Sequence, residues 1–136
     1  MADLYFVDAN VFLRLLVKED EEVWQRCYAF FERAKKGEIK ITTSVLVLAE
    51  IAGVLESYYG LTRQEIAEKL TSILNTPGFT MPQSDMIWKA VEHYLRHNVK
   101  FPDAYHALST TQAGAKAIAS FDKEFDSLPG VSRVEP

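Results

Sequence analysis

The chain has 136 residues, of which 48% are hydrophobic and 25% are charged, and its formal net charge is −4. This size and composition predict one ordered globular domain, residues 1–136, and exclude both extensive disorder and a second domain. The negative charge excludes a protein that coats nucleic acid through bulk electrostatics, but it is compatible with an acidic pocket that holds a cation.

Short strand patterns alternate with longer helical patterns along the chain. The predicted elements, in order, are a strand at residues 4–8, helices at 9–17 and 20–36, a strand at 39–42, helices at 44–59 and 62–75, an extended piece at 79–81, helices at 84–97 and 102–113, a strand at 116–120, a short helix at 122–128 and an edge strand at 131–134. Thr62 with Glu65 three residues later matches a capping box, and Pro102 favours the first turn of its helix.

This alternation predicts an α/β fold around a mainly parallel sheet. In such sheets, ligands bind beyond the carboxyl ends of the strands. Asp8 and Asp122 each follow a predicted strand in this way. Two acids far apart in the sequence are therefore expected to meet in space.

Four acidic residues interrupt or directly follow apolar segments: Asp8, Glu50, Asp103 and Asp122. A lone carboxylate in apolar surroundings is costly to desolvate, and several together repel one another unless a cation lies between them. Hard divalent cations such as Mg²⁺ take oxygen ligands and are often shared with substrate phosphates. The pattern therefore indicates a metal site that acts on phosphodiesters.

Each acid also has a simpler explanation. Asp8 and Asp122 stand where they would cap a following helix, and Asp103 stands where it would face the helix dipole. Glu50 lies beyond the capping turn, in a run from Val45 to Leu55 that is otherwise apolar except for Gly53. We therefore expect its side chain to point inward, with a buried ion pair to a distant arginine as the alternative to a metal.

Four segments together resemble the motifs of the PIN domain family, and most closely those of VapC-type toxin ribonucleases. They are Val-Asp-Ala-Asn-Val around Asp8, Thr43-Ser44 leading into the helix with Glu50, Phe-Pro-Asp-Ala around Asp103, and Ala-Ser-Phe-Asp-Lys-Glu-Phe around Asp122. The resemblance covers nearly the whole chain, in order. It implies a three-layer α/β/α sandwich in which these four acids are catalytic and bind Mg²⁺ or Mn²⁺.

The same resemblance implies accessory positions and a reaction. Asn10 and Ser120 match polar positions that orient ligands or water, and Asp126 is a candidate for a second, weaker cation. The implied activity is an endoribonuclease that hydrolyses RNA phosphodiesters with metal-activated water, because no motif supplies a nucleophilic side chain. Asp103 and Glu50 are the two candidates for the carboxylate that orients this water.

Resemblance to VapC-type toxins also implies an antitoxin partner and a homodimer. The helix at 20–36 has an apolar stripe of Val23, Cys27, Phe30 and Ala34, which Trp24, Tyr28 and Phe31 widen. A partner helix is expected to dock on an aromatic groove near Trp24, Tyr28 and Phe31, with a broad face buried against the sheet as the alternative.

Two other functions compete with the ribonuclease. A haloacid-dehalogenase-type phosphatase also has a strand that ends in Asp-x-Asp, but here Asn10 replaces the second aspartate. The other competitor is a non-cleaving PIN-like scaffold that binds RNA or protein. The intact set of four acids is evidence against an inactive site.

The single cysteine, Cys27, excludes an intramolecular disulfide and a thiolate zinc cage. No stretch is long and apolar enough to span a bilayer, and residues 4–17 contain polar residues that a signal peptide lacks. We therefore expect a cytoplasmic protein with no membrane partner.

Overall fold

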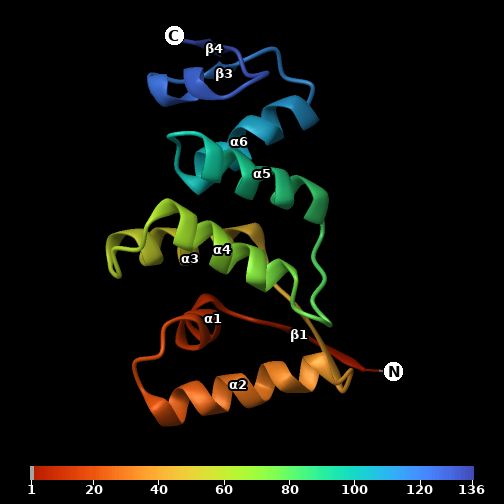
Figure 1. The fold of residues 1–136 in the computed structure, drawn as a ribbon. Helices are drawn as coiled ribbons and strands as arrows, with labels where there is room; N and C mark the ends of the chain where they lie inside the picture. The colour runs from red at the N-terminus through yellow and green to blue at the C-terminus, as the bar shows by residue number, and fades with distance from the viewer. Residues whose placement is uncertain (1) are drawn as a thin grey trace. The chain divides into compact units, whose positions relative to one another are not determined.

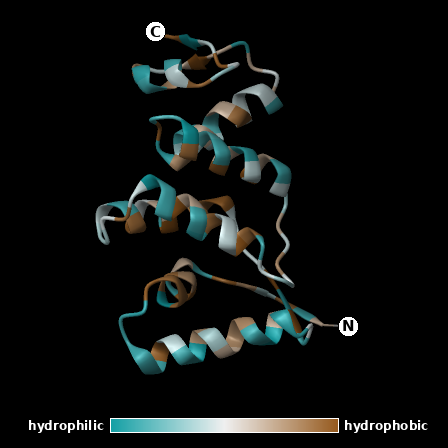
Figure 2. Cartoon of the chain, viewed as in Figure 1, coloured by the Kyte–Doolittle hydropathy of each residue, from teal (hydrophilic) through white to brown (hydrophobic). Residues whose placement is uncertain are grey.

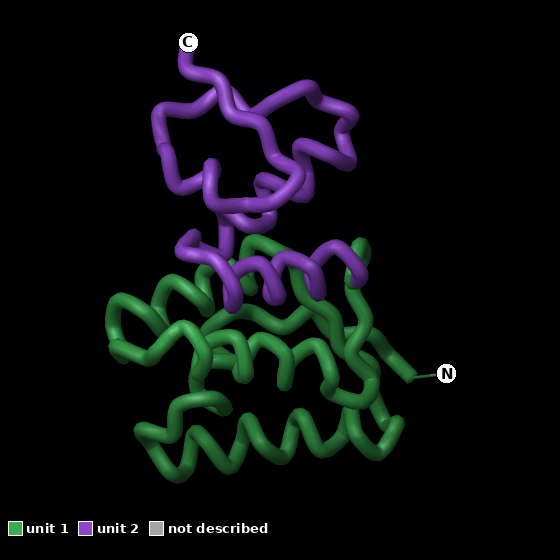
Figure 3. Tube along the Cα trace, turned by 45° about the horizontal axis from the view of Figure 1, so that its top comes forward, with its two compact units in different colours: residues 1–84 green, residues 85–136 purple. Residues whose placement is uncertain are grey.

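A computed structural model describes residues 2–136 of the chain. The chain forms two compact units, Met1–Ser84 and Asp85–Pro136, which are coloured separately in Figure 3. Each unit contains one pair of parallel strands together with helices. The single domain expected over residues 1–136 stays a prediction.

The elements labelled in Figure 1 follow the predicted order closely. They are β1 (Asp3–Phe6), α1 (Ala9–Leu16), α2 (Glu21–Lys35), β2 (Ile39–Thr42), α3 (Val45–Ser57), α4 (Arg63–Leu74), α5 (Ser84–Arg96), α6 (Phe101–Gln112), β3 (Ile118–Ala119), the 3₁₀ helix η1 (Lys123–Ser127) and β4 (Arg133–Val134). The capping box of α4 is confirmed, because Thr62 and Glu65 bond reciprocally to each other's backbone N–H. None of the helices in residues 2–136 has the length and apolar composition needed to cross a membrane.

In the first unit, β1 and β2 pair in parallel, from Asp3 opposite Ile39 to Phe6 opposite Thr42. Ile39 and Ile41 of β2 are buried and contribute to the core. The extended piece expected at 79–81 is reduced to one parallel bridge, in which Phe79 pairs with Ile41. The predicted parallel pairing of the strands is therefore confirmed.

Strand β1 is exposed along its whole length, although its apolar composition favours a buried strand. Leu4 is 59% exposed and Phe6 is 61% exposed. Within residues 2–136 its strand partner is β2, and Tyr5 contacts α2 through the ring of Phe30 at a centroid distance of 6.0 Å. Apolar composition identified the strand, but it did not determine how much of the strand is covered.

The core of the first unit lies between its helices and β2. Helix α1 packs on α2 and α3, and α3 packs beside α4, as Figure 1 shows. The largest fully buried side chains in this unit are Phe12, Ile39, Ile41, Leu48, Ile51, Leu55, Ile66 and Leu70.

The inward orientation expected for Glu50 was wrong, because its side chain is exposed. Helix α3 buries one face, which includes Leu48, Ile51 and Leu55, and Glu50 lies outside it. Leu46, one turn before Glu50, is 78% exposed. The apolar run from Val45 to Leu55 therefore forms a helix with one exposed side.

In the second unit, α6 begins after Lys100, with Pro102 in its first turn as predicted. Strands β3 and β4 pair in parallel, with Ile118 opposite Arg133. The helix expected at 122–128 is a 3₁₀ helix of five residues instead. Pro129 lies two residues beyond the end of this helix and has no backbone N–H, so it cannot donate the bond that would continue the helix.

Candidate metal centre

Three carboxylates gather in the second unit. Ligand oxygens of Asp103, Asp122 and Glu124 all lie within 4.8 Å of one another. Asp103 stands in the first turn of α6, Asp122 follows β3, and Glu124 lies at the start of η1. The structure therefore brings together two of the four predicted acids and adds Glu124 to them.

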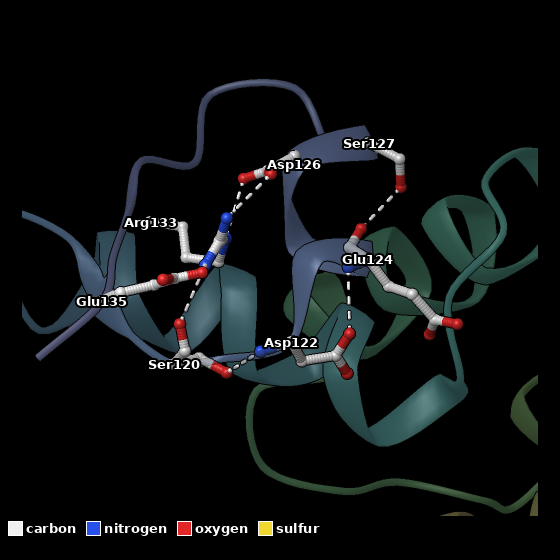
Figure 4. A network of polar contacts seen from close by, with 7 residues as sticks. All are labelled: Ser120, Asp122, Glu124, Asp126, Ser127, Arg133 and Glu135. Atoms are coloured by element: carbon white, nitrogen blue, oxygen red, sulfur yellow. Dashed lines mark hydrogen bonds and ion pairs between the residues drawn. The ribbon is translucent and has the colours of Figure 1, made fainter.

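Local hydrogen bonds fix the turn that carries two of these acids (Figure 4). The Asp122 N–H donates to Ser120 Oγ at 3.0 Å, and the Glu124 N–H donates to Asp122 Oδ1 at 2.9 Å. The capping explanation for Asp122 is thus correct, since its carboxylate caps η1. Capping uses one carboxylate oxygen, so it does not compete with a role in binding a cation.

The electrostatics of the cluster favour a cation. Burial raises the pKa of the Asp103 carboxyl, and the nearby Asp122 carboxylate raises it further, against smaller opposing effects of His106 and Lys100. Keeping the Asp103 carboxyl ionised therefore costs free energy, and a bound cation would lower that cost. Three oxygen donors at this spacing suit a hard divalent ion such as Mg²⁺ or Mn²⁺.

A cavity of about 650 Å³ adjoins the cluster, within the range of ligand pockets. Asp103, Asp122 and Ser120 line it, together with His106 and Thr110 of α6. These polar groups occupy one part of a largely apolar wall, which also includes Ala113, Ala115, Ile118, Ala119 and Phe125.

Asp8 and Glu50, the other two predicted acids, belong to the first unit. Asp8 is the N-cap residue of α1, yet its side chain makes no capping hydrogen bond, so the capping explanation for Asp8 is wrong. The buried ion pair considered for Glu50 is wrong as well, because Glu50 is exposed and none of the ion pairs in residues 2–136 includes it. Both carboxylates are exposed, and within the described part of the chain neither caps a helix with its side chain or joins an ion pair.

The first unit holds the backbone at Asp8 close to the start of α3. The Val7 N–H donates to the Thr42 carbonyl at 2.9 Å, and Thr43 Oγ1 donates to the Val7 carbonyl at 2.8 Å. Thr43 is buried, with 3% of its surface exposed. The junction after β1, which carries Asp8, is therefore fixed to the junction after β2, from which α3 and Glu50 follow.

The accessory residues have different surroundings. Asn10 is exposed in α1 and lines a cavity in the first unit together with Asp8. Ser120 receives the Asp122 N–H, as described above. Asp126 instead forms a two-pronged ion pair with Arg133, at 3.0 and 3.1 Å, and this guanidinium lowers the pKa of the Asp126 carboxyl.

Sequence reasoning missed Glu124. The available signal was a second acid two residues after Asp122, in Asp-Lys-Glu. A regular α-helix would turn residues two apart away from each other, which made Glu124 look like an ordinary surface acid. The tight turn into η1 brings it back beside Asp122.

The cavity that Asp8 and Asn10 line has a volume of about 530 Å³ and lies between β1, α1 and α2. Its apolar wall includes Val23, Cys27 and Phe30 of α2, the helix whose mixed hydropathy is visible in Figure 2. Arg14 and Arg26 also line it.

The aromatic residues Trp24, Tyr28 and Phe31 lie outside this lining. Phe31 is buried, and the Trp24 ring stacks on Tyr28 at 5.1 Å while its indole N–H donates to the Leu15 carbonyl. Tyr28 and Phe31 line a smaller cavity of about 320 Å³ beside the end of α4.

Comparison with known proteins agrees with this fold. A model of the PIN domain family matches residues 5–131, and the chain belongs to that family. It is similar to the VapC ribonuclease of Aquifex aeolicus (strain VF5), with 30% identity over 130 residues, 96% of this chain and 95% of that protein. The resemblance seen in the sequence and the predicted PIN-like α/β fold with parallel strands are therefore confirmed.

Proposed function

We propose that this protein is a divalent-metal-dependent endoribonuclease and the toxin component of a toxin–antitoxin pair. The observation that carries the proposal is the cluster of Asp103, Asp122 and Glu124 in a chain of the PIN domain family. The similarity to a protein named VapC ribonuclease supports RNA as the substrate.

We propose that Asp8 and Glu50 belong to the same cation-binding set as Asp103 and Asp122. Two features support this: within residues 2–136 neither Asp8 nor Glu50 caps a helix with its side chain or joins an ion pair, and the bond between Thr43 and Val7 fixes the backbone next to Asp8. Asn10 and Ser120 are the proposed accessory residues, and Glu124 joins the set.

The protein's own groups divide the work of hydrolysis. When Mg²⁺ or Mn²⁺ is bound, it offsets the charge that develops on the phosphoryl oxygens and makes water a better nucleophile. The carboxylates determine the position at which the charge on the phosphoryl oxygens is offset. Either Asp103 or Glu50 orients the attacking water and accepts its proton. His106 and Thr110 line the adjoining cavity and contact the polynucleotide there.

Cleavage of total RNA by the purified protein, measured with Mg²⁺ or Mn²⁺ and with EDTA, tests the proposal. Glu50→Gln is expected to lower the cleavage rate by about 10²–10⁴-fold, the range for losing a positioned carboxylate. Glu56→Gln is the matched control: it changes an exposed glutamate on the same helix and should leave the rate unchanged. Undiminished cleavage in EDTA would contradict the metal mechanism and indicate cleavage without a metal, whereas no cleavage under either condition would leave the non-cleaving scaffold.

The proposed antitoxin docks in the cavity between α1 and α2 through an apolar segment. We propose this cavity beside the expected groove near Trp24, Tyr28 and Phe31, which stays a prediction, because Val23 and Phe30 line the larger cavity, whereas Phe31 is buried and the Trp24 indole donates to the Leu15 carbonyl. Phe30→Ser should weaken inhibition by the cognate antitoxin while RNA cleavage by the free toxin persists. Unchanged inhibition would place the partner elsewhere.

The homodimer and the cytoplasmic location implied by the sequence remain part of this proposal. Sedimentation of the purified chain at several concentrations measures the dimer directly, and a monomer at all of them would contradict it. Membership in the PIN family argues against the haloacid-dehalogenase-type phosphatase.

A further inference from the structure

Arg133 on β4 is the centre of a compact polar network in the second unit (Figure 4). Its Nε and Nη2 donate to the two carboxylate oxygens of Asp126 at 3.0 and 3.1 Å. Its Nη1 donates to Glu135 at 2.8 Å and to the Ser120 carbonyl at 3.0 Å. Only 11% of the Arg133 side chain is exposed, although it carries a charge.

These contacts join both ends of one short segment. Ser120 stands just before the turn into η1 and Asp126 stands near the end of η1, and Arg133 binds both. The candidate ligands Asp122 and Glu124 lie between these two points in the chain. Any movement of the segment that separated its ends would break at least one bond to the guanidinium.

The network also continues from Arg133 to the ligands through hydrogen bonds. Arg133 holds the Ser120 carbonyl, the Ser120 hydroxyl receives the Asp122 N–H, and the Asp122 carboxylate receives the Glu124 N–H. The position of the Ser120 backbone thus affects the positions of the Asp122 and Glu124 carboxylates.

We propose that Arg133 is a positioning residue for the metal centre, holding residues 120–126 in the turn that places Asp122 and Glu124 beside Asp103. This inference rests on the proposed function of these acids as cation ligands. It assigns Arg133 no contact with substrate or metal.

Geometry rather than charge is the means by which Arg133 acts. Asp126 and Glu135 offset its positive charge, so the guanidinium does not repel a cation in the cluster. A planar guanidinium makes the paired bonds to Asp126 and still reaches Ser120, whereas the single ammonium of lysine cannot reproduce this fork.

The test measures the Mn²⁺ dissociation constant of the full chain by electron paramagnetic resonance, alongside urea unfolding and RNA cleavage. Arg133→Gln is expected to weaken Mn²⁺ binding about 10–100-fold, as for other residues that orient metal ligands. Arg133→Lys should recover only part of that loss. Arg96→Gln removes a guanidinium from an exposed pair with Glu92 and should bind Mn²⁺ like the wild type.

A purely structural role for Arg133 predicts a different result. If Arg133→Gln unfolds at a lower urea concentration but, when folded, binds Mn²⁺ with unchanged affinity, the inference is overturned. Should that variant not fold, Asp126→Asn weakens the paired bonds and leaves the bond to Ser120. Its Mn²⁺ affinity is expected to fall, and an unchanged affinity would again overturn the inference.

Binding and cleavage separate the inference from the proposed function. Wild-type protein that binds Mn²⁺ but cleaves no RNA would refute the ribonuclease, while a loss of Mn²⁺ affinity in Arg133→Gln would still support the positioning role. Wild-type cleavage that depends on Mn²⁺, with equal affinity in Arg133→Gln, would refute the positioning role alone.

Discussion

Replacing Thr43 with valine should destabilise the protein through a single hydrogen bond. Thr43 Oγ1 donates to the Val7 carbonyl at 2.8 Å, and both residues are only 3% exposed. Valine keeps the shape of the side chain and removes the donor, so the buried carbonyl loses a partner that water cannot replace. Leaving such a group unsatisfied costs about 1–3 kcal/mol, which we expect as the fall in the free energy of unfolding measured in urea.

Thr42→Val provides the matched control at the neighbouring position. The Thr42 hydroxyl makes only a long, 3.5 Å contact with the Thr43 carbonyl, so its loss should change stability by less than about 0.5 kcal/mol. Because the Thr43 bond also fixes the backbone before Asp8, RNA cleavage should fall more in Thr43→Val than in Thr42→Val. Equal stability of the two variants would refute the reasoning that this bond holds the junction.

Two further predictions concern a close backbone approach and a dependence on pH. Gly78 has φ +84°, and a Cβ there would lie 2.8 Å from the Ala34 carbonyl oxygen. Gly37 has a similar φ of +79° but open space around it, so Gly78→Ala should unfold at a lower urea concentration than Gly37→Ala. Equal losses of stability would mean that the close contact at Gly78 is relieved at no cost. Arg133 lowers the pKa of the Asp126 carboxyl below its usual 3.8, so the stability that this pair contributes is complete above that pH and is lost as the pH falls through the lower, folded-state pKa. The difference in stability between the wild type and Asp126→Asn should therefore shrink below about pH 4, and a difference that grew with acid would contradict the assignment.

The order of the elements was predictable because local signals agree with the fold. The capping box at Thr62 and the proline in the first turn of α6 act within a few residues, and both are present as expected. The alternating Ile39 and Ile41 of β2 gave the strand correctly for the same reason.

The exposure of β1 and of Glu50, and the tight turn into η1, could not be predicted from local sequence signals. The exposure of β1 and of Glu50 depends on which distant elements pack against them, and an apolar run in the sequence does not show which elements these are. Glu124 lies beside Asp122 at the start of η1, a short 3₁₀ helix whose geometry differs from that of the α-helix expected there. The roles expected for the four acids stay predictions, and the exposure of Asp8, Glu50 and Asp122 means that a desolvation cost does not account for these three residues.

The proposed ribonuclease depends on one divalent cation that Asp8, Glu50, Asp103 and Asp122 bind together. Its most direct test is the Mn²⁺ affinity of Asp8→Asn and Glu50→Gln beside that of Asp103→Asn, measured by electron paramagnetic resonance on folded protein. All three substitutions should weaken the same binding event by at least about tenfold, since even residues that only orient ligands cost that much. Wild-type affinity in Asp8→Asn and Glu50→Gln, with a loss confined to Asp103→Asn, would contradict a shared site.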